Sequence, residues 1–124
     1  LMIFVTADDD QRFVGDFAHD VATNVIARLA FATASDLKPF GATALALAPG
    51  RVRTERMIDA GLGEDAMESP LYAGRAAAAL AADADVARYS GRVLHVAELA
   101  RQYGFADADG RRPARFRFDE IAEG

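Results

Sequence analysis

The chain has 124 residues, of which 52% are hydrophobic and 27% are charged, and its formal net charge is -5. This length predicts one domain with a single core, and the composition excludes a long disordered segment. The negative charge disfavours a general nucleic-acid binder, which needs a dense Lys/Arg surface. We interpret two arginine clusters as solvated faces; they are Arg51, Arg53 and Arg56, and Arg111, Arg112, Arg115 and Arg117. The lack of cysteine excludes disulfides and thiolate chemistry and is compatible with the cytoplasm.

Residues 1–5, Leu-Met-Ile-Phe-Val, form a continuous apolar run that predicts a strand buried on both faces. The run is too short for the apolar part of a signal peptide, and no later run approaches the length of a membrane span. We therefore expect a cytoplasmic protein without a membrane partner. Because the chain starts inside a strand and with Leu, we also expect a truncated polypeptide.

The longest predicted helix covers 17–37. Its apolar residues recur at helical spacing in two rows, Phe17, Val21, Val25 and Leu29 in one and Ile26, Ala30, Thr33 and Leu37 in the other. A helix that is apolar on more than one face needs covering on two sides. Pro39 and Gly41 predict its end, since Pro cannot continue the hydrogen-bond ladder and Gly readily adopts the left-handed conformation.

Four further elements follow in chain order. The apolar run 42–48 lies between Gly41 and Pro49-Gly50 and predicts a second buried strand. The Ala-rich stretch 71–82 predicts a helix with Ser69 as its N-cap and Pro70 at its first position. Residues 92–97 predict a third strand, and 98–103 a short helix closed by Gly104.

This alternation predicts an α/β fold, with about three parallel strands joined by crossover helices, equivalent to the second half of a Rossmann-like domain. We assign 1–113 to this half-domain and 114–124 to a polar C-terminal tail. The alternating Arg115-Phe116-Arg117-Phe118 is interpreted as an edge segment. The outer side of the first strand is expected to be an open apolar edge that a partner, the tail or a second copy covers.

Residues 36–54, DLKPFGATALALAPGRVRT, resemble the short-chain dehydrogenase/reductase family from the end of its catalytic helix to its P-G-x-V-x-T motif. The later segments Glu68-Ser69-Pro70, 90–94 and 101–105 are similar to the C-terminal third of that family. The resemblance covers most of the stretch from Leu1 to about Pro113. It identifies the chain as the C-terminal half of a family member and implies hydride transfer between NAD or NADP and an alcohol or carbonyl compound.

The resemblance assigns Pro49, Gly50, Val52 and Thr54 to the nicotinamide end of the cofactor. A glycine lets the backbone approach a ligand, the Val52 amide can bond the carboxamide, and Thr54 offers a hydroxyl. The alternative is a plain Pro-Gly turn at the end of a strand.

The catalytic residues implied by the resemblance are altered. The family uses a Tyr and a Lys four residues apart on one helical face, and His19 and Thr23 occupy these positions. His19 can exchange a proton near neutral pH, but Thr23 has no charge to tune it; the alternative is an ordinary histidine at a helix start. Thr6 matches the serine that polarises the substrate carbonyl and retains a hydroxyl.

No glycine-rich turn for a pyrophosphate occurs, and Gly61-Leu62-Gly63 is no substitute because it follows no strand. We predict no metal site. Asp8-Asp9-Asp10 is interpreted as a solvated loop, and Asp107-x-Asp109-Gly110 lacks a further oxygen ligand where Arg111 follows. His95 is interpreted as a hydrogen-bonded strand histidine.

Two functional hypotheses follow. In the first, the chain derives from an NAD(P)-dependent oxidoreductase, with Thr6 polarising the carbonyl and His19 supplying the proton, but is inactive alone. It either binds NAD or NADP or holds no cofactor. In the second, it is a non-catalytic module that forms a homo-oligomer through the 17–37 helix, or a subunit completed by a separate N-terminal half. The substrate and the choice between NAD and NADP stay open.

Overall fold

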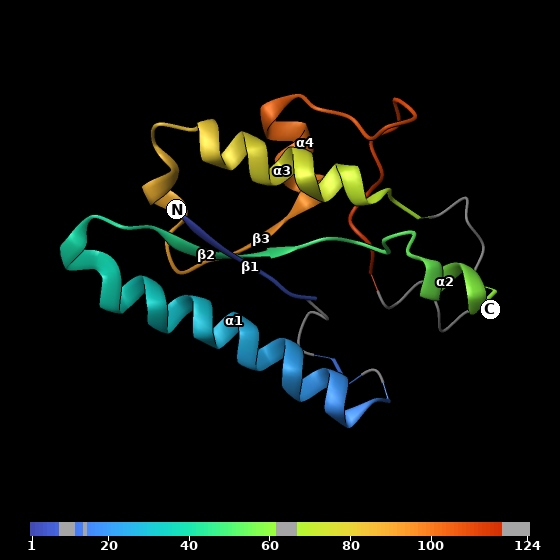
Figure 1. Ribbon diagram of the computed structural model, residues 1–124, viewed down its shortest axis with the longest axis horizontal. Helices are drawn as coiled ribbons and strands as arrows, with labels where there is room; N and C mark the ends of the chain where they lie inside the picture. Colours follow the sequence, from blue (N-terminus) through green and yellow to red (C-terminus); the bar gives the residue numbers. More distant parts are fainter. Residues whose placement is uncertain (8–11, 14, 62–66, 118–124) are drawn as a thin grey trace.

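The computed structural model describes residues 1–7, 12–13, 15–61 and 67–117. Its centre is a parallel sheet of β1 (Met2–Val5), β2 (Ala44–Ala48) and β3 (Val93–His95), in the order β1-β2-β3. Helix α1 (Phe17–Leu37) lies on one face of this sheet, and α3 (Pro70–Ala82) and α4 (Val96–Tyr103) lie on the other (Figure 1). The predicted α/β fold with three parallel strands and crossover helices is confirmed.

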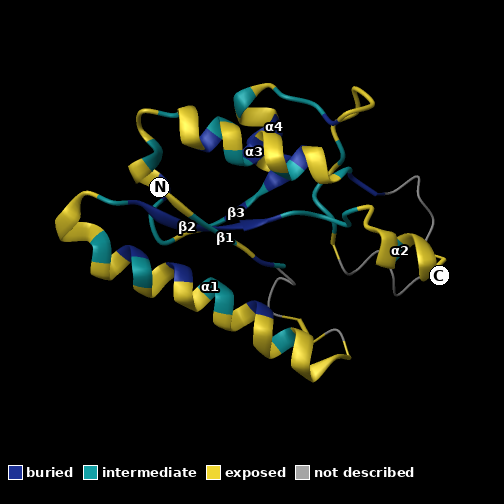
Figure 2. Cartoon of the chain, viewed as in Figure 1, coloured by how far each residue is buried: buried dark blue, intermediate teal, exposed yellow. Residues whose placement is uncertain are grey.

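Strand β2 forms the middle of the core. All five of its residues are buried, and it pairs with β1 on one side and β3 on the other (Figure 2). Leu45 and Leu47 pack in one cluster with residues of α3 and α4, including Tyr72, Leu80 and Leu99. Because side chains alternate along a strand, the intervening alanines of β2 face α1, and their small size lets that helix approach closely.

Helix α1 has the bounds that the sequence predicts. It begins at Phe17, where the Asp16 carboxylate caps it by accepting a hydrogen bond from the His19 amide at 3.0 Å. It ends in a 3₁₀ turn, Lys38–Phe40, and Gly41 follows in the left-handed conformation with φ of 67°. The buried face of α1 carries Thr23, Ala30 and Ala34, so the helix contacts the sheet through small side chains.

The remaining elements lie near their predicted positions, but β2 begins two residues later than predicted and the junction of β3 and α4 is shifted. The short helix α2 (Glu55–Asp59) lies in the loop after β2, and a 3₁₀ turn, Val86–Tyr89, connects α3 to β3. The predicted third strand extended to residue 97, but Val96 and Ala97 belong to α4 instead. They are buried there together with Leu99 and Ala100, a spacing that covers one helical face, and this burial explains the difference.

The expectation that 1–5 is buried on both faces was wrong. Leu1, Met2 and Val5 are exposed, Val5 by 60%. Only β2 pairs with β1 among the residues that the structure describes, so the other edge of β1 has no neighbour in that part of the chain. Within the described part of the chain, the outer edge of β1 is therefore open, as predicted. Over the same residues, no helix has both the length and the hydropathy to cross a membrane.

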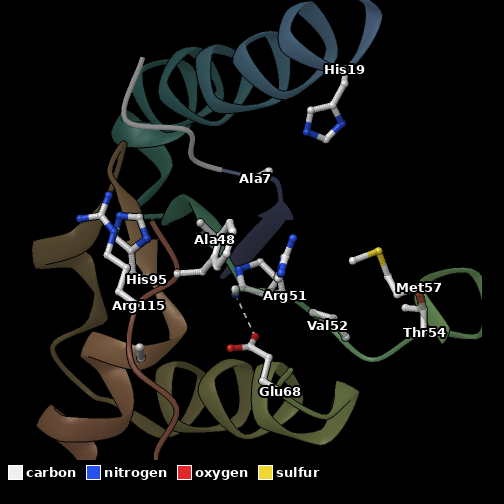
Figure 3. Close-up of a pocket in the computed structure, with 14 residues that line it drawn as sticks. Ala7, His19, Ala48, Arg51, Val52, Thr54, Met57, Glu68, His95 and Arg115 are labelled. Atoms are coloured by element: carbon white, nitrogen blue, oxygen red, sulfur yellow. Dashed lines mark hydrogen bonds between the residues drawn. The ribbon is translucent and has the colours of Figure 1, made fainter. Parts of the chain in front are cut away.

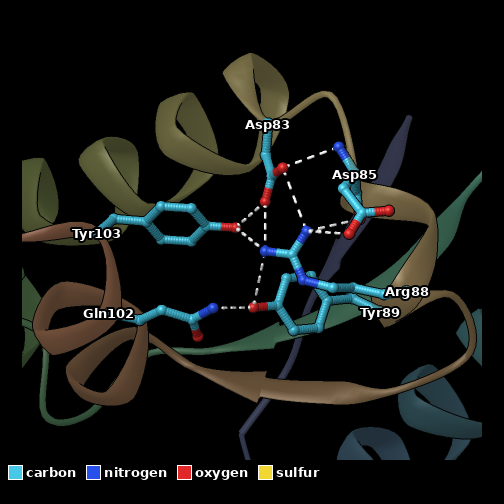
Figure 4. A network of polar contacts seen from close by, with 6 residues as sticks. All are labelled: Asp83, Asp85, Arg88, Tyr89, Gln102 and Tyr103. Atoms are coloured by element: carbon cyan, nitrogen blue, oxygen red, sulfur yellow. Dashed lines mark hydrogen bonds and ion pairs between the residues drawn. The ribbon is translucent and has the colours of Figure 1, made fainter.

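A polar network fixes the end of α3 (Figure 4). The Asp83 carboxylate, next to the last residue of α3, accepts hydrogen bonds from the Arg88 guanidinium, at 2.6 Å, and from the Tyr103 hydroxyl. Gln102 donates a hydrogen bond to the Tyr89 hydroxyl. The network thus connects α3, the 3₁₀ turn and α4 on the face of the sheet opposite α1.

Candidate functional site

A pocket of about 420 Å³ lies at the carboxyl ends of the three strands. Ala7, Ala48 and His95, from the ends of β1, β2 and β3 or just after them, all line it. In parallel α/β sheets this edge is where ligands bind, because the loops that follow the strands leave a crevice there. The pocket therefore occupies the position at which the fold itself predicts a ligand.

Five of the seven residues proposed from the sequence line this pocket. Pro49, Gly50, Val52 and Thr54 form the wall that follows β2, and His19 reaches toward the pocket from the first turn of α1 (Figure 3). The structure thus brings together the P-G-x-V-x-T turn and the candidate proton donor, which are 30 residues or more apart in the sequence.

Thr6 and Thr23 lie outside this lining. The Thr6 hydroxyl donates to the Thr23 carbonyl at 2.9 Å, and both side chains are buried. The Thr23 hydroxyl in turn donates to the Asp20 carbonyl at 3.1 Å. These two threonines therefore connect β1 to α1, and Thr6 can polarise a substrate carbonyl only if its hydroxyl leaves the helix backbone.

Glu68 is a pocket residue to which the sequence analysis gave no role. It lies just before α3, is only 2% exposed, and accepts a hydrogen bond from the Gly50 amide at 3.0 Å (Figure 3). A Cβ atom on Gly50 would lie 3.0 Å from the Glu68 Oε2 atom, so the absence of a side chain at Gly50 permits this approach. The only sequence signal was an acidic residue directly before the Ser-Pro helix start.

The environment of Glu68 disfavours its charge. Burial raises the pKa of its carboxyl to about 7; the Gly50 hydrogen bond opposes this shift and the nearby Asp107 carboxylate adds to it. An acid with such a pKa changes its protonation state near neutral pH. A buried acid in a cleft with a displaced pKa is a candidate functional group, and here it stands on the wall formed by the P-G turn.

Backbone pairing places the next residues of the turn. The Glu68 backbone pairs with its neighbours across the turn, accepting from the Arg53 amide and donating to the Arg51 carbonyl, each at 2.8 Å. The Val52 amide, between these two residues, therefore points away from the Glu68 backbone, and it donates to no acceptor among the described residues. The Thr54 hydroxyl accepts from the Met57 amide at 3.4 Å as the N-cap of α2, so its own hydrogen stays available to a ligand.

The remaining walls combine cationic and aromatic groups. The Arg51 guanidinium lies over the Phe116 ring, 4.7 Å from its centre, and Arg115 lies 3.7 Å from the Glu98 carboxylate. The interpretation of both arginine clusters as solvated faces therefore holds only in part. Arg51 and Arg115 are partly buried pocket residues, whereas the other five arginines of the clusters, Arg53, Arg56, Arg111, Arg112 and Arg117, are exposed.

The described residues contain no group of three metal-ligating side chains. The buried Asp107 carboxylate instead accepts hydrogen bonds from the Ser69 amide and hydroxyl and from the Ala108 amide, which holds the C-terminal segment against the start of α3. His95 lines the pocket. The predicted loop Asp8-Asp9-Asp10, residues 62 and 63 of the Gly61 segment, and residues 118–124 of the tail lie outside the described residues.

Comparison with known proteins gives two curated relatives. The chain is 30% identical over 126 residues to Dehydrogenase/reductase SDR family member 1 of Mus musculus and 26% identical to the protein of that name from Homo sapiens. Each match covers 90% of this chain but 40% of the relative, so the chain spans well under half the length of these proteins. No family model matches the chain. Over nine tenths of its length, this chain is thus related to the short-chain dehydrogenase/reductase family.

Proposed function

We propose that the pocket holds the nicotinamide end of NAD or NADP, in a site that transfers hydride between an alcohol and a carbonyl compound. The observation that carries this proposal is the position of the P-G-x-V-x-T turn. Pro49, Gly50, Val52 and Thr54 line a pocket at the carboxyl ends of three parallel strands, opposite His19. The relationship to the dehydrogenase/reductase family supports the same cofactor class.

The donors and apolar surfaces of the pocket fit a nicotinamide ring. The Val52 amide and the Thr54 hydroxyl can donate hydrogen bonds to its carboxamide oxygen, and the Ala48, Met57 and Ala97 side chains offer apolar surface to the ring. The bound cofactor would supply or accept the hydride. His19 is the group that exchanges the accompanying proton, because it is the histidine that faces the pocket from α1 (Figure 3).

The proposed activity of these 124 residues by themselves is binding without turnover. Thr23 has no ammonium group with which to tune His19, and its hydroxyl is engaged by the helix backbone. The sequence also contains no G-x-G-x-x-G turn, on which dinucleotide folds place the pyrophosphate. Catalysis would therefore require further protein groups for the pyrophosphate.

Calorimetric titration of the purified chain with NADH and NADPH tests the proposal. We expect micromolar binding of at least one of them, weakened about tenfold in Thr54→Val and restored in Thr54→Ser, which retains the hydroxyl. Ser35→Ala removes an exposed hydroxyl of α1 and serves as the control. Failure of the folded wild-type chain to bind either dinucleotide would overturn the proposal.

A second candidate function is association through α1. Phe17, Val21, Val25 and Leu29 form one apolar row along this helix, and all four are exposed, Phe17 by 75%. Monomeric proteins rarely expose a continuous apolar row of this kind. We propose that the row is covered by a second copy of the chain, which would form a two-fold interface from the same surface on each copy. A separate polypeptide that extends the sheet beyond β1 is the competing form of this proposal.

Sedimentation velocity distinguishes these forms. We expect the wild-type chain to be a dimer and Val25→Glu to be a monomer, because a charge in the centre of the interface is left without a partner. Leu71→Glu introduces the same change at an exposed leucine of α3, on the opposite side of the molecule, and should leave the dimer intact. A monomeric wild-type chain would leave only the separate polypeptide as the partner.

A further inference from the structure

The carboxyl of Glu68 makes fewer hydrogen bonds than its burial calls for. Its Oε1 atom accepts from the Gly50 amide at 3.0 Å, and no other donor among the described residues reaches the carboxyl. A carboxylate can accept about four hydrogen bonds, and a buried one with a single donor carries a desolvation cost. That cost is removed when the group is protonated or when a ligand supplies a donor.

The Oε2 atom of Glu68 lies against the Gly50 backbone, 3.0 Å from where a Cβ atom would stand, and it accepts no hydrogen bond from the described residues. Glu68 lines the pocket, and its backbone pairs with the turn at Val52, whose amide points away from that pairing. The pocket wall thus combines an N–H donor at Val52 with a carboxyl acceptor at Glu68. A primary amide carries the complementary pair, a carbonyl oxygen and an NH₂ group, on one carbon atom.

We propose that Glu68 recognises the carboxamide of the nicotinamide ring, with one oxygen held by the Gly50 amide and the other accepting a hydrogen bond from the carboxamide NH₂. This inference rests on the proposed function and extends it, since it names the group that distinguishes the nicotinamide carboxamide from other ring substituents. The raised pKa of the Glu68 carboxyl agrees with it, because a ligand donor stabilises the ionised form that burial disfavours.

The Gly50 amide makes Glu68→Gln an informative substitution. The amide is a donor, so it holds the glutamine with its carbonyl oxygen toward Gly50 and its NH₂ toward the pocket. Two NH₂ groups then face each other when the carboxamide binds. The substitution therefore replaces an acceptor by a donor at nearly constant volume.

The test compares the binding of NAD⁺ and NADP⁺ with that of their 3-acetylpyridine analogues, in which a methyl group replaces the carboxamide NH₂. We expect the wild-type chain to bind the natural dinucleotide about tenfold more tightly than the analogue, the difference that one hydrogen bond to a charged acceptor makes. In Glu68→Gln we expect this preference to disappear or invert. Asp36→Asn, which removes an exposed carboxylate at the far end of α1, should keep the wild-type preference.

The outcomes separate this inference from the proposed function. If the folded wild-type chain binds neither dinucleotide, the proposed function fails and the role of Glu68 fails with it. If the wild-type chain binds the natural dinucleotide and its analogue equally, or if Glu68→Gln keeps the wild-type preference, only the role of Glu68 is overturned. If Glu68→Gln does not fold, as circular dichroism would show, equal binding of the natural dinucleotide and its analogue by the wild-type chain still overturns the role of Glu68.

Discussion

Glu68 couples the stability of the fold to pH. Its pKa is raised from 4.5 to about 7 in the folded chain, mainly because burial disfavours the carboxylate. The folded state therefore binds the proton of Glu68 more tightly than the unfolded state. The resulting contribution to the free energy of unfolding is full below about pH 4.5 and is lost as pH rises through about 7. We expect Glu68→Gln to remove up to about 3 kcal/mol of the pH dependence of the free energy of unfolding between these pH values.

Urea unfolding of the wild-type chain and of Glu68→Gln at several pH values measures this difference in pH dependence. Asp36→Asn is the matched control, because it removes a carboxylate that is exposed on α1. Parallel stability profiles for the wild-type chain and Glu68→Gln would show that Glu68 does not hold its proton in the folded state.

Tyr72 carries a buried polar group that is expected to cost stability. Its side chain is fully buried in the core against the edge of the Phe105 ring, and its hydroxyl has no hydrogen-bond partner among the described residues. Burying an unpaired hydroxyl costs about 1–3 kcal/mol. Tyr72→Phe keeps the ring and removes that cost, so we expect the free energy of unfolding to stay level or rise by about 1 kcal/mol. A clear loss of stability in thermal or urea unfolding would mean that the hydroxyl has a partner in solution.

At the scale of elements, Asp83 connects α3 to α4. Hydrogen bonds from Arg88 and Tyr103 hold the pKa of its carboxyl well below the ordinary value (Figure 4). The ionised Asp83 therefore stabilises the fold above the pKa of the unfolded state, and this stabilisation is lost only in strong acid. Tyr103→Phe removes the hydroxyl donor from α4 and the contact between the helices that it makes, while Arg88 and the Asp85 amide still donate to Asp83. We expect the melting temperature to fall by several degrees, as for a domain of this size that loses about one hydrogen bond.

The control for this prediction is a substitution on the same helix, α4. Arg101→Lys keeps the charge of an exposed α4 residue outside the network and should leave the melting temperature unchanged. Equal melting temperatures for Tyr103→Phe and the wild-type chain would show that the Tyr103 hydroxyl does not contribute to holding α3 and α4 together.

The sequence predicted most elements because each is encoded locally. The α1 helix ends where Pro39 and Gly41 forbid its continuation, and α3 begins at the Ser69-Pro70 pair. The junction of β3 and α4 was misplaced because Val96 and Ala97 are apolar and suit either structure. They belong to the helix because they are buried on one face of α4, and this burial depends on packing against α3 rather than on local sequence.

At the scale of the whole molecule, β2 is the most protected element. It is the central strand, it is buried along its full length, and helices cover both faces of the sheet (Figure 2). We expect hydrogen exchange measured by NMR to be slowest at its amides and fast in α2, which contains no buried residue. Exchange in β2 as fast as in α2 would mean that the sheet opens without global unfolding.

The sequence by itself determined the order of strands and helices, the parallel sheet and the family relationship. The periods of apolar residues, the Pro and Gly stops and the Pro49 to Thr54 motif all act over a few residues, so they can be read along the chain. Only the tertiary structure decided that Met2 and Val5 of β1 are exposed, that Thr6 is bonded to α1, and that Glu68 joins Gly50 in the pocket. The last two features depend on contacts between residues 17 or 18 positions apart, which no local pattern specifies, because only chain folding brings them together.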